Sequence, residues 1–562
     1  HYKSKKIKKT SFLDPNFMKT LESALRFGTA LLVENVENVD PVLNPVLNRE
    51  VQLTGGRRLV RVGDQEVDFS PSFAMYMTTR DPTHQFTPDL CSRVTFVNFT
   101  VTPASLESQC LSRVLQSERP DIEEKRVGLL KLQGQYRARL RELEENLLNA
   151  LNASKGNILD DDDVMVKLET LKSEAAQVQV EVDRTDEVMK EVNAISAVFK
   201  PLAVACSRVY FGMSRLSDLH FMYHFSLPFF LDVVKDVLTN NVSATLAPTK
   251  TDSSSSSSRV DELMLRLFRI SYRRIAQGLL ESDRIVFAMR LAQIFLRSKS
   301  RDDSSDSVMG VEELDFLLGR KTITAVAANT VVANAVLKDS SLSASQRAQL
   351  SLVSSMSGMT SLLSSMEKNA EAWQCVIDAP TSRVAPPSSW AMNTVTDAFR
   401  WLLVLKILRP DALIDGVVEY LSKVFDASFL TEAEDMSLAR FVDEVSHARS
   451  PMMLCSTPGF DASAHVNALA QERGLSKRLT SVSMGSAEGF DAAIKCIDAA
   501  VVSGTWVLLR NVHLCPSWLK KLEKRLYAIN PTDGFRLFLT AEINSALPMN
   551  LCRLSHVKIF EA

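Results

Sequence analysis

Apolar residues recur at spacings of three and four along two stretches between residues 106 and 200. This is the period of one helix face, and Glu, Lys and Arg fill many of the positions between. The linker 152–163 holds a glycine and four aspartates, which is typical of a helix end followed by a new helix start. The pattern predicts an antiparallel hairpin of two heptad-patterned helices; an ordinary packed pair inside a bundle is the alternative. The apolar positions are Leu129, Leu132, Tyr136, Leu140, Leu143, Leu147, Leu151, Val164, Leu168, Leu171, Ala175, Val178, Val182, Met189 and Val192.

Short strands alternating with helices are predicted at both ends of the chain. In the first helix, Phe17, Leu21 and Leu25 share one face, and Gly63-Asp64 is the turn of a predicted hairpin. This alternation predicts layered α/β sheets at the two ends, as a weak internal repeat. The predicted strands are 30–33, 59–62, 66–69, 73–77, 94–100, 452–455, 479–482, 506–509, 535–539 and 557–560, and the later helices are 464–473, 489–502 and 517–527.

The middle of the chain is predicted to be helical. Broad apolar faces mark 196–238, an amphipathic pattern marks 259–298, and 311–440 is mostly helical in pattern. Between the first two, 240–258 includes six consecutive serines and is predicted to be a disordered loop. The fold class is therefore α/β plus all-α.

Composition narrows the class of protein. With 562 residues, 46% hydrophobic and 23% charged, the chain has the mix of a soluble globular protein of three or four domains. Its net charge of −2 provides no bulk attraction to nucleic acid or to acidic membranes. No apolar run is predicted to span a bilayer, and the start at His1 suggests a fragment of a longer polypeptide.

Metal sites are not predicted. The eight cysteines form no CxxC pair, which favours free thiols in a reducing compartment and no zinc site. His220 and His224 have the i,i+4 spacing of a helical metal pair but lack the glutamate of HExxH.

Candidate chemistry near the N-terminus lies at strand ends. Thr78-Thr79 follow the predicted strand 73–77, and Arg93 comes immediately before the next predicted strand, 94–100. This is the sensor-then-arginine order of an AAA+ ATPase module, in which the arginine reaches a neighbour's nucleotide. A buried strand pair with a surface arginine is the alternative. An earlier strand ends in Glu34-Asn35 where an Asp-Glu pair is expected, and asparagine cannot act as a base.

Long stretches of the chain resemble the dynein heavy chain family, cytoplasmic type. Residues 12–26, 31–50 and 68–99 carry the match to the fifth AAA+ module, and 399–405 with Pro410 resembles the helix before the sixth. The resemblance implies two degenerate, P-loop NTPase-like AAA+ modules with helical small domains and an antiparallel coiled-coil hairpin. The implied parts are 1–105, a truncated fifth large domain; 106–200, with the strut or buttress; 201–300, a helical small domain with a serine-rich loop at 251–258; 301–445, a helical connection; and 446–562, the sixth large domain.

The second module departs from a working P-loop. Residues 456–463 occupy the strand-to-helix turn where GxPGxGK[ST] would lie, and only Pro458-Gly459 survive. Ala462 stands at the lysine position, and Asp461 places a negative charge where phosphates would sit. The later strand ends in Arg510-Asn511, again without acids. We expect no catalytic residue, metal or cofactor in this fragment, with ATP and Mg²⁺ bound elsewhere in the parent motor.

The resemblance also implies roles and partners. Arg93 would serve as a trans arginine finger for the fourth module, with a structural salt bridge as the alternative. The expected function is transmission of ATP-driven ring changes to the stalk and to microtubule affinity; a stand-alone scaffold that binds partners through its coiled coil is the alternative, and an active ATPase is disfavoured. Expected partners are the neighbouring modules and stalk, the microtubule indirectly, and light, intermediate and light-intermediate chains through the tail, but no nucleic acid or membrane. The expected location is the cytoplasm, on the microtubule cytoskeleton.

Overall fold

The computed structural model divides into two compact units, His1–Thr102 and Pro103–Ala562, which are described separately. It describes residues 7–12, 14, 16–34, 36, 39–79, 86–153, 162–239, 253–299, 311–319, 342–356, 359, 361–380, 383–387, 390, 394–434, 436–444 and 448–561.

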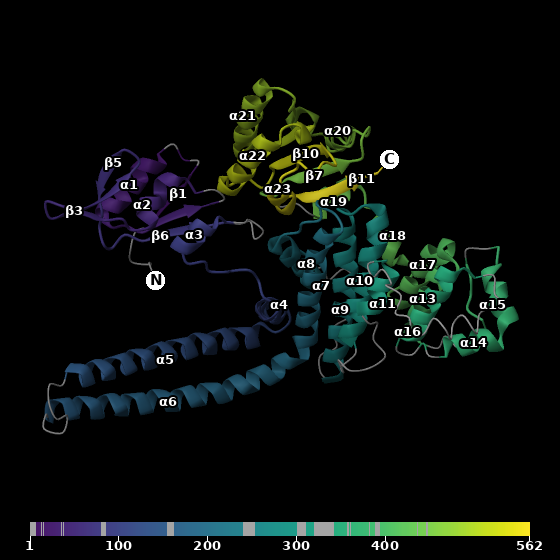
Figure 1. The fold of residues 1–562 in the computed structure, drawn as a ribbon, viewed down its shortest axis with the longest axis horizontal. Coiled ribbons are helices and arrows are strands. Elements are labelled where there is room, and N and C mark those ends of the chain that lie inside the picture. The colour runs from purple at the N-terminus through teal and green to yellow at the C-terminus, as the bar shows by residue number, and fades with distance from the viewer. Residues whose placement is uncertain are drawn as a thin grey trace. The chain divides into compact units, whose positions relative to one another are not determined.

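The first unit is built on a parallel sheet of order β1-β2-β6 (Figure 1). Helix α1 packs its apolar face, with Leu21 and Leu25 fully buried, into one core with Leu31 and Val33 of β2. It ends at Gly28, whose φ of 63° suits a left-handed cap. The elements are β1 (Lys8–Ser11), α1 (Phe17–Phe27), β2 (Leu31–Glu34), η1 (Pro41–Leu43), α2 (Asn44–Leu47), β6 (Met75–Thr78) and α3 (Pro88–Arg93).

A small antiparallel sheet completes this unit. The predicted hairpin is confirmed as β4 (Arg57–Val62) and β5 (Gln65–Asp68), turned at Gly63 with φ of 62°. A further strand, β3 (Gln52–Thr54), pairs with β4 and was not predicted. All three residues of β3 are exposed, so no alternation of apolar and polar positions marks it.

The strand predicted at 94–100 is wrong. Residues 94–100 form no strand in the structure, and Phe96, Val97 and Phe99 are 52%, 65% and 90% exposed. A strand exists only where a neighbouring strand completes its backbone hydrogen bonds, and no described strand pairs with residues 94–100.

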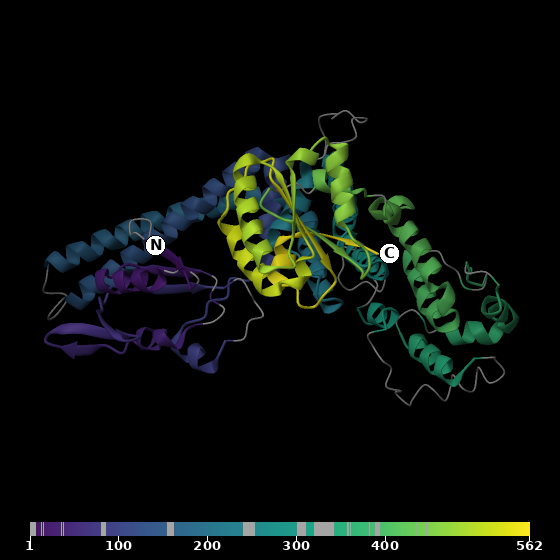
Figure 2. The ribbon, with the colours of Figure 1, turned by 90° about the horizontal axis from the view of Figure 1, so that it is seen from above.

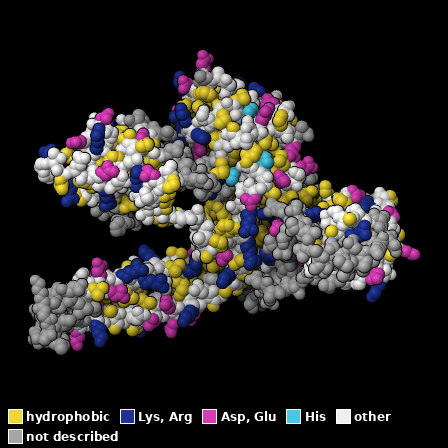
Figure 3. All heavy atoms as spheres, in the orientation of Figure 1, with side chains coloured by type: hydrophobic (Ala, Val, Ile, Leu, Met, Phe, Trp, Pro, Cys, Tyr) yellow, Lys and Arg dark blue, Asp and Glu magenta, His cyan; other side chains and the backbone are white. Residues whose placement is uncertain are grey.

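Two long helices of the second unit lie side by side (Figures 1 and 2). They are α5 (Pro120–Ala153) and α6 (Asp162–Ser196), preceded by α4 (Pro103–Glu118). They run antiparallel, because Gln133 Nε2 donates to Asp186 Oδ1 at 2.7 Å while Arg139, further along α5, lies 3.4 Å from Glu174, which is earlier in α6. Figure 3 shows basic and acidic side chains interspersed along the pair.

The heptad prediction needs one correction. Leu143 and Val182 are buried at 3% and 9% exposure, as predicted for the inner face. Leu132, however, is 42% exposed, and Gln133 takes the inner position. The reason is that a hydrogen bond to Asp186 satisfies the glutamine there. The side chains of Leu147, Leu151, Val164, Leu168 and Leu171 lie outside the described residues.

The hairpin continues into a helical body. Helix α6 leads through η3 (Ala197–Phe199) into α7, whose buried face packs on α4, α9 and α10. The amphipathic helical pattern predicted at 259–298 forms two helices, which are separated at Gln277–Leu280. The serine run 253–258, predicted to be a loop, forms the start of α9, where it continues an amphipathic helix; residues 240–252 lie outside the described residues. The elements are α7 (Lys200–Ser214), η4 (Arg215–Asp218), α8 (Leu227–Thr239), α9 (Ser253–Ala276) and α10 (Glu281–Lys299).

One apolar window is long enough to span a bilayer by length and composition, contrary to prediction. It lies in Lys172–Asp218, has a mean hydropathy of 1.3 and is 50% buried in the fold. Helix α7 lies within Lys172–Asp218 and has eight buried residues, so core packing accounts for the apolar character of that helix.

A second helical group follows along the chain. Capping boxes at Ser343 and Thr394 start α13 and α16. Trp373, Trp390 and Trp401 cluster with ring centroids 5.4–6.2 Å apart. The elements are α11 (Val311–Leu317), α13 (Ala344–Ser354), α14 (Leu362–Lys368), α15 (Ala370–Ile377), α16 (Val395–Leu408), η5 (Pro410–Ala412), α17 (Leu413–Val424), α18 (Ser428–Glu434) and α19 (Leu438–Glu444).

A five-stranded parallel sheet of order β11-β7-β10-β9-β8 closes the second unit. All five predicted strands are confirmed, and every residue of β7, an inner strand, is buried. Figure 1 shows α21 and α22 on the opposite side of the sheet from α19 and α20. The elements are β7 (Met452–Ser456), α20 (Ser463–Glu472), η6 (Ser476–Arg478), β8 (Leu479–Ser483), α21 (Ala487–Ser503), β9 (Trp506–Arg510), η7 (Val512–Leu514), α22 (Pro516–Ala528), β10 (Arg536–Glu542), α23 (Met549–Leu554) and β11 (His556–Phe560).

Candidate functional site

An internal ion pair occupies the turn between β7 and α20. Asp461 Oδ1 accepts a hydrogen bond from the Ser463 backbone N–H at 2.9 Å. Its other oxygen, Oδ2, lies 3.0 Å from Arg510 Nη2, and Arg510 Nε donates to Ser463 Oγ at 3.2 Å. The structure therefore joins the first turn of α20 to the last residue of β9 through one carboxylate.

This arrangement bears directly on anion binding. Backbone N–H groups at a helix start after a parallel strand are where phosphates bind in P-loop proteins. Here the Asp461 carboxylate takes that hydrogen bond itself, and hydrogen bonding by the Ser463 side chain, with the Arg510 charge, lowers its pKa. Ala462, at the lysine position, is 1% exposed and offers no charge. The side chains of Asp461 and Arg510 are 53% and 42% exposed, so the pair adds less than about 1 kcal/mol to stability.

A hydroxyl lies on the same edge of the sheet. Asn511 has the left-handed φ of 57°, and its backbone N–H donates to Thr540 Oγ1 at 3.2 Å near the end of β10. Thr540 was missed from the sequence, although Thr78 stands near the end of β6 in the other sheet and gives the pattern that could have found it. Pro458 and Gly459 lie in the turn itself, and Gly459 has φ of 92°.

The first unit places its candidate residues as follows. Glu34, at the end of β2, is the register partner of Thr78 on β6, and Thr79 follows directly. Asn35 lies outside the described residues. Arg93 ends α3, and its Nη2 lies 2.6 Å from Asp89 Oδ1 one turn earlier. Its side chain is 20% exposed, and its buried Nη1 has no hydrogen-bond partner among the described residues.

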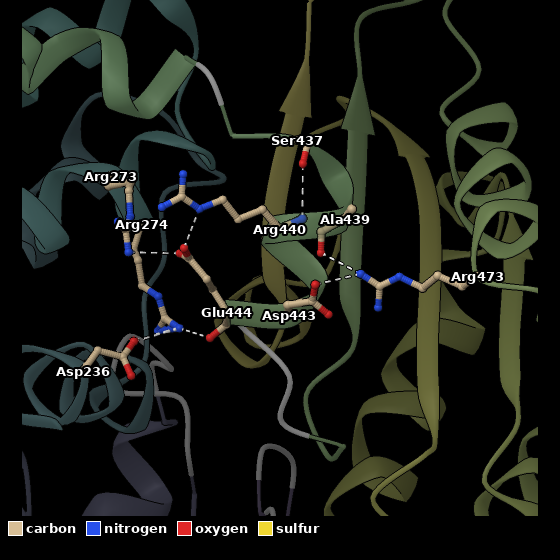
Figure 4. A network of polar contacts seen from close by, with 9 residues as sticks. All are labelled: Asp236, Arg273, Arg274, Ser437, Ala439, Arg440, Asp443, Glu444 and Arg473. Atoms are coloured by element: carbon tan, nitrogen blue, oxygen red, sulfur yellow. Dashed lines mark hydrogen bonds and ion pairs between the residues drawn. The ribbon is translucent and has the colours of Figure 1, made fainter. Parts of the chain in front are cut away.

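A network of charges links the helical body to the second sheet (Figure 4). Arg274 on α9 is buried and binds Asp236 on α8 at 3.0 Å and the Glu444 backbone carbonyl on α19. Arg273 lies 3.1 Å from the Glu444 carboxylate, and Arg440 lies 2.8 Å from it. Burial lowers the pKa of Arg274 and raises that of Asp236.

The sheet side of this junction extends the network. Arg473, at the end of α20, lies 2.8 Å from Asp443 and donates to the Ala439 carbonyl at 3.1 Å. Sequence reasoning missed the whole network, because its bonded partners are up to 170 residues apart in the sequence.

A buried lysine forms a second link between the helical body and the second sheet. Lys558 on β11 donates to Gln277 Oε1 and, at 3.0 Å, to the Met436 carbonyl. Its Nζ lies 5.7 Å from the ring centroids of Phe441 and Phe560. The Ile559 backbone N–H donates to the Gln277 carbonyl at 2.8 Å, so β11 bonds directly to the turn between α9 and α10.

Stability should depend on pH through Lys558. Burial, with the Arg284 charge, lowers its pKa from 10.5 to about 8. Between these values the unfolded chain binds more protons than the folded protein, so the lysine's contribution to stability rises with pH. We expect the unfolding free energy of wild type, minus that of Lys558→Met, to rise by about 3 kcal/mol at most from pH 8 to 10.5. Urea unfolding across this range measures it, and a pH-independent difference would contradict it.

Metal binding has no support in the described part of the chain. No group of three or more His, Cys, Asp or Glu residues there could hold a metal ion.

Comparison with known proteins gives a consistent picture. Residues 1–178 match the family described as ATP-binding dynein motor region, and residues 447–559 match the dynein heavy chain region D6 P-loop domain. The whole chain is 44% identical to "Dynein heavy chain, cytoplasmic" of Drosophila melanogaster and 43% identical to the Dictyostelium discoideum protein of that name. Over 97% of its length it is 30% identical to "Cytoplasmic dynein 2 heavy chain 1" of Rattus norvegicus. The chain spans 12% of the length of each of these relatives.

Proposed function

Because this chain belongs to the dynein heavy chain family, we propose that it is a structural, force-transmitting segment of a microtubule motor. In this proposal, ATP-driven changes elsewhere in the motor ring reach the α5–α6 hairpin, which acts as a coiled-coil strut and alters the stalk's affinity for the microtubule. A hairpin suits this role because helix pairs have discrete alternative registers. A stand-alone scaffold is not favoured, since relatives match over the whole of this chain within much longer proteins.

The observation that carries this proposal is a continuous mechanical path. Helix α6 passes through η3 into α7 without a flexible linker, and α7 is buried in the helical body. That body is tied to α19 by Arg274 and to β11 by Lys558, and both of these side chains are buried. Displacement of the hairpin would therefore be passed to the sheet by packed helices and bonded side chains.

We further propose that neither module hydrolyses ATP, and that both are degenerate AAA+ modules. In the second, Asp461 and Arg510 fill the phosphate position with an internal pair. In the first, Glu34 ends β2 and is followed in the sequence by Asn35, so the expected Asp-Glu pair is not present there. Arg93 would serve the nucleotide of a neighbouring module only after leaving Asp89, an exposed partner that adds little stability.

Purified as it stands, the chain should release no phosphate from ATP and should bind no fluorescent ATP analogue at millimolar concentration. The reason is the Asp461 carboxylate at the helix start and the absence of a lysine at residue 462. Phosphate release and fluorescence anisotropy measure the two quantities. Asp461→Asn, which keeps the shape but removes the charge, is the matched variant and should also lack turnover. Saturable hydrolysis by wild type would refute the structural role of both modules.

Partners and location follow in the same proposal. The neighbouring modules of the same heavy chain and the stalk are the direct partners, and the microtubule is reached through them. Contacts with light, intermediate and light-intermediate chains are assigned to the tail. The cytoplasm is the proposed location, in line with the names of the relatives.

A further inference from the structure

The turn between β7 and α20 is held in shape by contacts other than those of the Asp461 side chain. Ser456 Oγ, at the end of β7, donates to the Phe460 carbonyl at 2.8 Å across the turn. The Phe460 ring stacks on His465 of α20 and on Phe560 of β11, with ring centroids 5.6 and 5.7 Å apart. We therefore expect the turn to keep its path when the Asp461 carboxylate is removed.

The Asp461 carboxylate adds a contact of a different kind, between elements that are not neighbours in the sheet. One oxygen accepts the Ser463 backbone N–H at the start of α20, and the other lies 3.0 Å from Arg510 Nη2 at the end of β9. Strand β10 lies between β7 and β9, so the carboxylate links two elements that β10 separates. A backbone N–H at a helix start and a guanidinium are also the groups with which proteins bind a phosphate ion.

This contact is open to ions from solution. The side chains of Asp461 and Arg510 are 53% and 42% exposed. Glu542, another acid at this edge of the sheet, lies 3.8 Å from His513 Nε2. Without the Asp461 carboxylate, the Ser463 N–H and the Arg510 guanidinium would lose the acceptor that they share, and a dissolved anion could reach both groups.

We propose that Asp461 is a tethered anion, which holds the start of α20 to the end of β9 as a phosphate ion would. The second module is then kept in one arrangement by its own side chain, whatever the concentration of nucleotide. This inference rests on the proposed function, in which the module binds no ATP, and it identifies the group that takes the ligand's place. A contact that cannot diffuse away suits a segment whose work is to pass on movement.

Asp461→Ala should convert the internal contact into a binding site for inorganic phosphate. Calorimetric titration of the 562-residue chain with sodium phosphate, at constant ionic strength, should show saturable binding about tenfold tighter than to wild type. Amide hydrogen exchange, followed by mass spectrometry, should be faster over residues 461–466 in the variant, and phosphate should slow it again. Wild type should show neither change, because its own carboxylate already accepts the Ser463 N–H.

The double variant Asp461→Ala with Arg510→Ala is the matched control, since it keeps the helix start but removes the cation. It should lose the phosphate binding that Asp461→Ala gains. No phosphate binding by Asp461→Ala, equal binding by wild type, or binding that survives in the double variant would each overturn the proposal. Unfolding of Asp461→Ala, measured by circular dichroism, would also overturn it, because the turn would then depend on more than this contact. ATP hydrolysis by wild type is measured separately and would instead refute the proposed function.

Discussion

Replacing Leu143 and Val182 by aspartate should separate α5 from α6 while the rest of the chain stays folded. Both side chains are buried on the inner faces of the hairpin, at 3% and 9% exposure. A carboxylate at either position loses its water without gaining a partner, which costs on the order of 3 kcal/mol per site. Circular dichroism should show loss of helix, and limited proteolysis should cut within 120–196. Leu148→Asp is the control, since Leu148 is 59% exposed and its replacement should change neither readout.

In the whole motor the same pair of substitutions tests transmission. We expect basal ATP turnover to persist, because no hydrolytic group is proposed in this segment, while stimulation by microtubules is lost. ATPase assays with and without microtubules measure both. Microtubule stimulation that survives an opened hairpin would mean that force does not pass along α5 and α6.

Arg274→Ala should be the most destabilising change at the junction between the helical body and the second sheet. Arg274 is buried, and its loss leaves Asp236 and the Glu444 carbonyl without their cation. Breaking such a pair from one side costs about 3 kcal/mol, reduced from the fully buried case because Asp236 is 29% exposed. Equilibrium denaturation in urea gives the difference in unfolding free energy.

Arg440→Ala provides the matched control for that experiment. Arg440 binds the same Glu444, one turn away on α19, but is 53% exposed. An exposed i,i+4 pair is worth about 0.5 kcal/mol, so this variant should unfold nearly as wild type does. Equal effects of the two substitutions would show that burial of Arg274 is not what stabilises the junction.

Sequence pattern predicted the second sheet well because its central strands are continuous apolar runs. Met452–Ser456 is buried throughout, and such a run between turn residues has few alternatives. The three exposed residues of β3 carry no such pattern, and residues 94–100 carry the pattern but pair with no described strand. In the hairpin, a polar side chain at 133 satisfied by Asp186 displaced the predicted Leu132 from the inner face.

The candidate site was predictable in part. The loss of the P-loop lysine at Ala462 is a local feature of one turn and can be read from the sequence. The pairing of Asp461 with Arg510 joins residues 49 apart in the sequence and depends on the strand order, in which β10 lies between β7 and β9. Whether Arg93 faces solvent or its own helix is set by a side-chain rotamer, which no spacing encodes.

Strand β6, at one end of the first sheet, affects how readily the chain associates with other copies in solution. Among the described strands β6 has a single neighbour, β2, so one row of its backbone donors and acceptors faces away from the sheet. Such an edge is a template for a strand from another molecule, and natural edges are usually blunted by charge, proline or a bulge. The four residues of β6, MYMT, contain neither a charged residue nor a proline. The shortness of β6, four residues, limits intermolecular pairing along this edge, and solutions of this chain are best kept dilute.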